Sequence, residues 1–177
     1  MTLDEVDGLV HDYIVADGSY PSAIGFHQFA KSVCTSVNDV VSHGVPNSYT
    51  LQDGDYLNID VVCYKNGHHG DNSAMVMIGD CHPDIKDMIK TTRESLFLAI
   101  EKCRPGASFK VIGETIEDYA HSKGYFVNRE FGGHGVGAHL HMAPLVHHYR
   151  TNDQRPDEMK PGMAFTIEPI LMMSSQF

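Results

Sequence analysis

Two aspartates on a predicted β-hairpin are the residues of this chain best placed to do chemistry. The stretch from Asn58 to Asp71 has the sequence NIDVVCYKNGHHGD, in which Asn66-Gly67 is a strong signal for a two-residue hairpin turn. The turn sets the register of three predicted cross-strand pairs, which are Lys65 with His68, Val62 with Asp71, and Asp60 with Ser73. Because side chains alternate between the two faces of a strand, Asp60 and Asp71 become diagonal neighbours on one face, with side chains roughly 5–7 Å apart.

The proximity of these two carboxylates has a physical consequence. Two carboxylates this close repel each other and raise the pKa of one of them, unless a cation lies between them. The spacing fits a pair of carboxylates that binds hard divalent ions. The alternative is a pair of solvated aspartates on an exposed hairpin face, and these two residues alone leave both interpretations open.

A glycine-rich run surrounds His134 in the sequence GGHGVG at residues 132–137. One interpretation is a loop that needs glycine for positive φ angles, in which the histidine is incidental. A second is a phosphate-binding loop, but the order of the glycines does not match that spacing and no clear helix follows. A third is a metal-ligand histidine, brought close to the ion because glycine lets the backbone approach. The residues alone leave the choice open.

Glu168 and two histidines lie in contexts that also fit a site. Glu168 follows the apolar run 164–167 and precedes a proline, and a glutamate buried there is costly unless it is paired or bound to a metal. The alternative is a glutamate on an edge strand that faces water. His43 and His141 each lie beside a turn that contains proline, where a solvated loop histidine is the alternative.

Three carboxylates and one histidine together form a candidate set of metal ligands. The set is Asp60, Asp71, His134 and Glu168, with His43 and His141 as neighbours. A mixture of carboxylate oxygens and imidazole nitrogen suits Mn, Fe, Co or Zn better than calcium or a structural zinc. Two such ions about 3.5–4 Å apart can share a hydroxide nucleophile, so the set predicts a two-metal hydrolase.

Composition and charge exclude several other classes of protein. The 177 residues, 42% hydrophobic and 20% charged, predict a globular chain of one domain or of one domain and a fragment. The net charge of −10 argues against nucleic-acid binding, and no apolar run approaches the roughly 18 residues that cross a membrane. Met1 opens directly into a polar helical pattern, so we expect no signal peptide. The cysteines lack CxxC spacing, which predicts reduced thiols at Cys34, Cys63, Cys81 and Cys103.

The pattern of apolar residues predicts an α+β fold of antiparallel strands with helices on one face. Helices are predicted from Thr2, as the N-cap of a capping box, to about Ala16, from His82-Pro83 to before Pro105, and at about 110–122. Strands are predicted within 31–41, in the central hairpin, and at about 145–149 and 163–167, with a polar, turn-rich stretch at 151–162. An acidic residue follows an apolar strand twice, at 58–60 and 166–168, which weakly indicates two similar halves.

Five stretches spread over most of the chain resemble the methionine aminopeptidases of type 1. They are KSVCTSVNDVVSHGVP (31–46), DGDYLNIDVVCYKNGHHGD (53–71), GGHGVG (132–137), HMAP (141–144) and PGMAFTIEP (161–169). The resemblance implies the pita-bread fold, in which two pseudo-symmetric halves with a curved antiparallel sheet flanked by helices surround a dinuclear metal site. It also implies removal of the initiator methionine from new polypeptides.

The resemblance implies roles for individual residues of this chain. The metal ligands are matched by Asp60, Asp71, His134 and Glu168. Glu168 also matches the general base for metal-bound water. The histidines that contact the substrate amide and the tetrahedral intermediate are matched by His43 and His141. The methionine pocket is matched by Phe26, His27, Phe29, Cys34 and Leu140. Aromatic edges and sulfur pack well against a thioether, which agrees with this pocket.

The end of the chain departs from the pattern of the family. The family has a fifth ligand, a second glutamate that bridges both metals and lies some tens of residues after the position of Glu168. This chain ends Ser174-Ser175-Gln176-Phe177, nine residues after Glu168 and before such a glutamate. We therefore expect one catalytic domain over 1–177 that lacks the last strands and the fifth ligand, binds at most one metal well and has little or no peptidase activity.

Three functions are compatible with these residues. The first is a methionyl aminopeptidase that uses two divalent ions (Co, Mn, Fe or Zn) and a metal-bridging hydroxide to remove the N-terminal methionine. The second is a catalytically impaired or non-catalytic relative that binds a partner, and the third is an enzyme similar to aminopeptidase P or prolidase. We expect a cytoplasmic monomer that acts on nascent N-termini, with the ribosome as a candidate partner, no membrane and no sequence-specific nucleic acid. Import into an organelle is the alternative location.

Overall fold

The chain forms two compact units, which are described separately. The computed structural model describes residues 1–152 and 158–175. Unit 1 comprises Met1–Ile85 and Val136–Leu140, and unit 2 comprises Lys86–Gly135 and His141–Phe177. The predicted turn-rich stretch 151–162 lies partly, and the terminal Gln176-Phe177 wholly, outside the described residues.

Unit 1 begins with helix α1 (Leu3–Ala16), whose start confirms the predicted capping box. The Thr2 hydroxyl accepts a hydrogen bond of 3.2 Å from the Glu5 backbone N–H, and the Glu5 carboxylate accepts one of 2.6 Å from the Thr2 N–H. These two bonds satisfy backbone donors that the first turn of a helix leaves without intrahelical partners.

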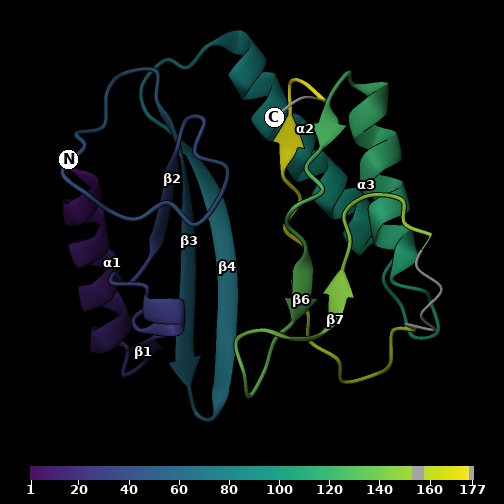
Figure 1. Cartoon of the computed structure of the whole chain (residues 1–177), viewed down its shortest axis with the longest axis horizontal. Coiled ribbons are helices and arrows are strands. Elements are labelled where there is room, and N and C mark those ends of the chain that lie inside the picture. Colours follow the sequence, from purple (N-terminus) through teal and green to yellow (C-terminus); the bar gives the residue numbers. More distant parts are fainter. Residues whose placement is uncertain (153–157, 176–177) are drawn as a thin grey trace. The chain divides into compact units, whose positions relative to one another are not determined.

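The centre of unit 1 is a four-stranded antiparallel sheet in which β3 (Tyr56–Lys65) and β4 (His68–Met77) lie side by side (Figure 1). The predicted register of this hairpin is confirmed for all three pairs. Asn66 and Gly67 form the turn with φ of 51° and 89°, the left-handed conformations that Asn-Gly adopts readily. The other edge of β3 pairs with β2 (Cys34–Val37) and, nearer the turn, with β1 (Tyr20–Pro21).

The predicted strand within 31–41 is shorter than expected. It is β2 alone, because Asn38 takes a φ of 53° and ends the strand. The Asn38 backbone N–H still donates to the Tyr56 carbonyl, but the Asn38 side-chain oxygen, instead of its carbonyl, accepts the hydrogen bond from the Tyr56 backbone N–H. A short 3₁₀ turn, η1 (Phe26–Gln28), lies in the loop between β1 and β2.

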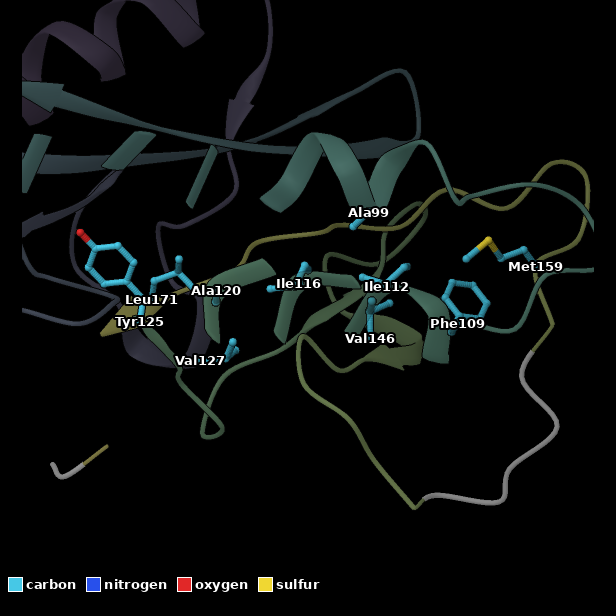
Figure 2. Packing of buried hydrophobic residues seen from close by; sticks show 10 residues of the cluster. All are labelled: Ala99, Phe109, Ile112, Ile116, Ala120, Tyr125, Val127, Val146, Met159 and Leu171. Carbon is cyan, nitrogen blue, oxygen red and sulfur yellow. The ribbon is translucent and has the colours of Figure 1, made fainter. Parts of the chain in front are cut away.

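Two helices carry much of the core of unit 2, α2 (Pro83–Ile100), which belongs to this unit from Lys86 onward, and α3 (Lys110–Ser122). The predicted bounds of α3 are confirmed at both ends, and α2 ends before Pro105 as expected. Buried residues on α3 recur every four positions at Ile112, Ile116 and Ala120, the spacing of one helix face. Figure 2 shows these side chains in one cluster with Ala99, Phe109, Tyr125, Val127, Val146, Met159 and Leu171.

The strands of unit 2 are short and differ from two predictions. They form the antiparallel pairs β5 (Phe126–Val127) with β8 (Leu171–Met172), and β6 (Gly133–Gly135) with β7 (Met142–Val146). The strand predicted at 145–149 lies earlier, as β7, because the carbonyls of His147 and Tyr149 pack against Gly113 of α3.

The prediction of a strand at 163–167 is wrong. Phe165 makes only an isolated bridge to Gly135. The ladder stops there because the His134 backbone N–H donates its hydrogen bond to the Thr166 hydroxyl instead of to a backbone carbonyl. Antiparallel strand pairs and helices nevertheless confirm the α+β class. In the described part of the chain, no helix has both the length and the apolar character needed to cross a membrane.

Candidate metal and active site

Unit 1 contributes the two aspartates of the predicted site. Asp60 lies on β3 and Asp71 on β4, and both side chains are half-buried. Val62 pairs with Asp71, two residues along β3 from Asp60, so Asp60, Val62 and Asp71 belong to one face of the sheet. The hairpin therefore places the two carboxylates as the sequence predicts.

Cys34 is the nearest neighbour of Asp60 on the adjacent strand. The two residues are register partners in the β2–β3 pair. Burial, and then the negative charges of Asp60 and Asp71, raise the pKa of the Cys34 thiol to about 12. Cys34 is therefore a neutral thiol at physiological pH, which suits the wall of an apolar pocket better than a nucleophile or a thiolate ligand.

An apolar cluster lies on the same part of unit 1. Ala23, Val62 and Leu140 form its buried centre, and Phe26 and Phe29 pack against it. The structure thus brings together three of the predicted pocket residues, Phe26, Phe29 and Leu140. His27 is exposed, with its ring edge against Phe26 at 4.5 Å between centroids. Val62 was not predicted as a pocket residue, although its alternation with Asp60 along the strand was a usable signal.

The loop that carries His43 is fixed by the glycine that follows. His43 has a φ of 53°, an uncommon conformation for a residue with a side chain. The Gly44 carbonyl accepts a hydrogen bond of 2.7 Å from the Thr35 N–H, and the Gly44 N–H donates to the Ser36 hydroxyl at 3.1 Å. A Cβ on Gly44 would overlap the Thr35 carbonyl, so glycine is required for this close approach.

Unit 2 contributes His134, whose ring orientation is set by its own backbone. Its Nδ1 lies 3.0 Å from the Gly135 carbonyl oxygen. Because a carbonyl only accepts, Nδ1 carries the proton and Nε2 presents its lone pair. That tautomer is the one a histidine needs to bind a metal through Nε2.

The glycines around His134 serve close packing. Gly132, Gly133 and Gly135 do not have positive φ angles, which overturns the interpretation of a loop that needs them. A Cβ on Gly133 would overlap the Thr166 carbonyl, and one on Gly135 would overlap the Ala143 carbonyl. Glycine here lets three segments of backbone approach one another, and the β6–β7 register shifts between His134 and Gly135.

Glu168 lies within reach of His134 in the same unit. Its Oε1 is 3.5 Å from His134 Nε2. Ligand atoms that each lie about 2.0–2.2 Å from one tetrahedral ion are separated by roughly this distance. The donor set therefore fits a divalent metal, with an imidazole lone pair and a carboxylate oxygen facing each other.

A buried histidine holds the backbone of Glu168. His148 is only 1% exposed, and its Nε2 accepts a hydrogen bond of 3.1 Å from the Glu168 N–H. Burial, and then the nearby His147, lower the pKa of His148 to about 3, so the imidazole is neutral and Nδ1 carries its proton. Nothing in the sequence marks His148, because adjacent histidines carry no signal for such a contact.

His141 lies against His134 in unit 2. Their ring centroids are 4.1 Å apart with the planes at 64°, and His141 is exposed to solvent. The structure thus brings together His134, His141 and Glu168 within unit 2. It brings together Asp60, Asp71 and Cys34 within unit 1.

The α+β fold and this carboxylate–histidine set are typical of a metallopeptidase. The chain belongs to metallopeptidase family M24, whose sequence profile matches residues 1–176. It is 46% identical to methionine aminopeptidase 1D, chloroplastic/mitochondrial, of Arabidopsis thaliana, over 99% of this chain and 50% of that protein. It is also 46% identical to methionine aminopeptidase 1D, mitochondrial, of Homo sapiens, over 99% of this chain and 52% of that protein.

A solved structure supports the same family and the pita-bread fold. Methionine aminopeptidase from Rickettsia prowazekii superposes with a TM-score of 0.94 at 36% sequence identity, covering 98% of this chain and 70% of that one. The chain spans about half the length of the curated relatives it matches.

Proposed function

We propose that the protein is a metal-dependent aminopeptidase that removes N-terminal methionine from polypeptides. The observation that carries the proposal is the pair His134 Nε2 and Glu168 Oε1, 3.5 Å apart, with the imidazole in the tautomer that binds metals. The methionine aminopeptidases among its relatives support the same activity. We also propose that residues 1–177 belong to one catalytic domain.

The proposed ligands of divalent ions are Asp60, Asp71, His134 and Glu168. Cobalt, manganese, iron and zinc all suit oxygen and imidazole ligands. When bound, such ions lower the pKa of a coordinated water and polarise a carbonyl group.

The remaining residues would bind and orient the peptide. Glu168 would accept a proton as the general base, and His43 and His141 would donate hydrogen bonds to the substrate amide and to the developing oxyanion. The methionine side chain would pack against the apolar cluster. Its members here are Phe26, Phe29 and Leu140, with the neutral thiol of Cys34 and the ring of His27 at the edge. Sulfur and aromatic edges favour a thioether.

Hydrolysis by the purified protein tests this proposal. Three tripeptides of matched length, beginning Met-Gly, Leu-Gly and Ala-Pro, would be incubated with the protein after addition of Co²⁺ or Mn²⁺. We expect methionine release that needs metal and is lost in Glu168→Gln. Release from the proline peptide instead would favour an enzyme similar to aminopeptidase P.

The low activity expected for residues 1–177 stays a prediction, and the same assay tests it. Turnover as fast as that of an active methionine aminopeptidase would contradict it. Metal content separates an enzyme from a non-catalytic binding protein. A protein that binds neither Co²⁺ nor Mn²⁺ in a titration would favour the non-catalytic alternative.

We further propose a cytoplasmic monomer that meets nascent chains near the ribosome. Some relatives bear the names chloroplastic and mitochondrial, so an organellar location is the alternative. Fractionation of cells that express the tagged protein would distinguish the two, and sedimentation analysis would give the oligomeric state.

A further inference from the structure

The Thr166 hydroxyl lies between two of the proposed metal ligands of unit 2. It accepts a hydrogen bond of 2.9 Å from the His134 backbone N–H. It also lies 2.6 Å from Glu168 Oε1, the oxygen that faces His134 Nε2. One side chain therefore contacts the backbone of the histidine and the carboxylate of the glutamate.

The direction of these hydrogen bonds follows from the single proton of a hydroxyl. The carboxylate can only accept, and its distance of 2.6 Å is that of a strong O–H···O⁻ bond. The His134 carbonyl is a weaker candidate for the same proton, because it lies 3.5 Å away. Thr166 thus donates to Glu168 and accepts from His134, which uses both capacities of the hydroxyl.

The backbone around Thr166 is arranged for this contact. The Thr166 N–H donates to the His134 carbonyl at 2.8 Å, while the His134 N–H donates to the Thr166 hydroxyl instead of to a carbonyl. Gly133 allows the approach, because a Cβ there would overlap the Thr166 carbonyl. The regular β ladder ends at this point, because the Thr166 hydroxyl accepts the hydrogen bond that a backbone carbonyl would otherwise accept.

We propose that Thr166 is a positioning residue, which holds the Glu168 carboxylate and the His134 backbone in the arrangement that binds a divalent ion. The inference rests on the proposed metal-dependent function. Its physical basis is that residues hydrogen-bonded to metal ligands fix ligand orientation, and that their loss typically weakens metal affinity by roughly 10–100-fold. Valine has nearly the shape of threonine but neither donates nor accepts, so it removes both hydrogen bonds at once.

Titration of the apoprotein with CoCl₂ tests the proposal. The visible d–d absorption of bound Co²⁺ reports its coordination, and competition with a chelator gives its dissociation constant. We expect Thr166→Val to weaken Co²⁺ binding by roughly 10–100-fold and to alter the spectrum. Thr166→Ser, which keeps the hydroxyl, should bind Co²⁺ with an affinity close to that of the wild type. Thr92→Val is the matched control, since that hydroxyl donates to the Met88 carbonyl within α2.

Each outcome decides the question. Loss of affinity in Thr166→Val with rescue in Thr166→Ser supports the proposal. Wild-type affinity and spectrum in Thr166→Val, or equal losses in the valine and serine variants, overturn it. Circular dichroism of each apoprotein shows that the variant is folded, and Thr166→Ala replaces Thr166→Val if the valine variant is not. If the wild type binds no Co²⁺, the proposed function fails and the inference fails with it.

Discussion

Cys34 is the register partner of Asp60 across the β2–β3 pair, and the charges of Asp60 and Asp71 both raise the pKa of its thiol. Cys34, a residue of the proposed methionine pocket, and the two carboxylates thus belong to neighbouring strands of one sheet. The Asn66-Gly67 turn fixes this arrangement, because a shift of one residue in the β3–β4 register would turn Asp71 to the other face. The turn therefore determines which side chains lie on the same face and can bind the same metal ion.

The first prediction concerns the two carboxylates of this sheet. Asp71→Asn removes one negative charge and one of the proposed anionic ligands. We expect its affinity for Co²⁺ or Mn²⁺ to fall by at least the roughly 10–100-fold typical of changes around a metal site, as measured by calorimetric titration. We expect the stability of the apoprotein not to fall, because two close carboxylates repel each other.

Asp12→Asn is the control for this prediction. It makes the same change of charge at an exposed position on α1. Metal affinity should be unchanged in this variant. If Asp71→Asn and Asp12→Asn have the same affinity as the wild type, Asp71 is not a ligand.

The parts of the fold that follow local rules could be predicted from the sequence. The Asn66-Gly67 hairpin and the Thr2 capping box are set by residues within a few positions of each other, and both are confirmed. The extended segment before Glu168 was predicted as a strand and is not one. Its backbone is decided by the Thr166 hydroxyl, which replaces a carbonyl as the acceptor from His134, 32 residues away.

The same distinction applies to the candidate site. The residue types that bind metals could be chosen from the sequence, because carboxylates and imidazoles are recognisable by chemistry. The residues that hold them could not be chosen. His148 supports Glu168 only through a backbone N–H, and Gly133 acts through the absence of a side chain. Thr166 could have been predicted in part. It lies two residues before Glu168, and side chains two residues apart in an extended segment lie on the same side.

The second prediction concerns two glycines in helices. Their replacement by alanine should change the stability of the protein in opposite directions. Gly8 lies within α1, where an added Cβ would meet nothing within 4 Å. Gly8→Ala should therefore stabilise the protein by about 0.5–1 kcal/mol, the difference in helix propensity. Gly113 lies within α3, where a Cβ would overlap the carbonyls of His147 and Tyr149. Gly113→Ala should therefore destabilise it by about 1–3 kcal/mol.

Urea denaturation measures both effects. Hydrogen exchange with mass spectrometry assigns each change to α1 in unit 1 or to α3 in unit 2, since local stabilities differ across a structure. A Gly113→Ala variant as stable as the wild type would show that the segment carrying His148 can move away from α3 at little cost.

A third prediction concerns the acid stability of unit 1. Burial favours the neutral form of Asp55, but hydrogen bonds from the Asn38 amide, the Gln52 N–H and the Tyr49 hydroxyl outweigh burial and lower the pKa of Asp55 below 3.8. The unfolded chain then binds a proton more readily than the folded protein. The stabilisation is fully present above the ordinary pKa and is lost as the pH falls through the lower, folded value.

Asp55→Asn tests this linkage. At neutral pH the amide leaves donors unsatisfied, and we expect a loss of about 1–3 kcal/mol in the free energy of unfolding. Between pH 5 and 3 the wild type should lose stability more steeply than the variant. Urea unfolding at several pH values measures both slopes, and parallel slopes would contradict the assignment.

The fourth prediction concerns the selectivity of the pocket. Phe29→Ala removes an aromatic ring that packs against Ala23, Val62 and Leu140. We expect KM for a peptide with N-terminal methionine, or Kd for methionine where turnover is slow, to rise by roughly 10–200-fold, the range for lost apolar contact in a pocket. Metal affinity should not change, because Phe29 carries no ligand atom.

Phe97→Ala is the matched control, because that ring is 49% exposed on α2. Equal effects in the two variants, or a loss of metal affinity in Phe29→Ala, would show that the cluster supports the fold and does not hold methionine.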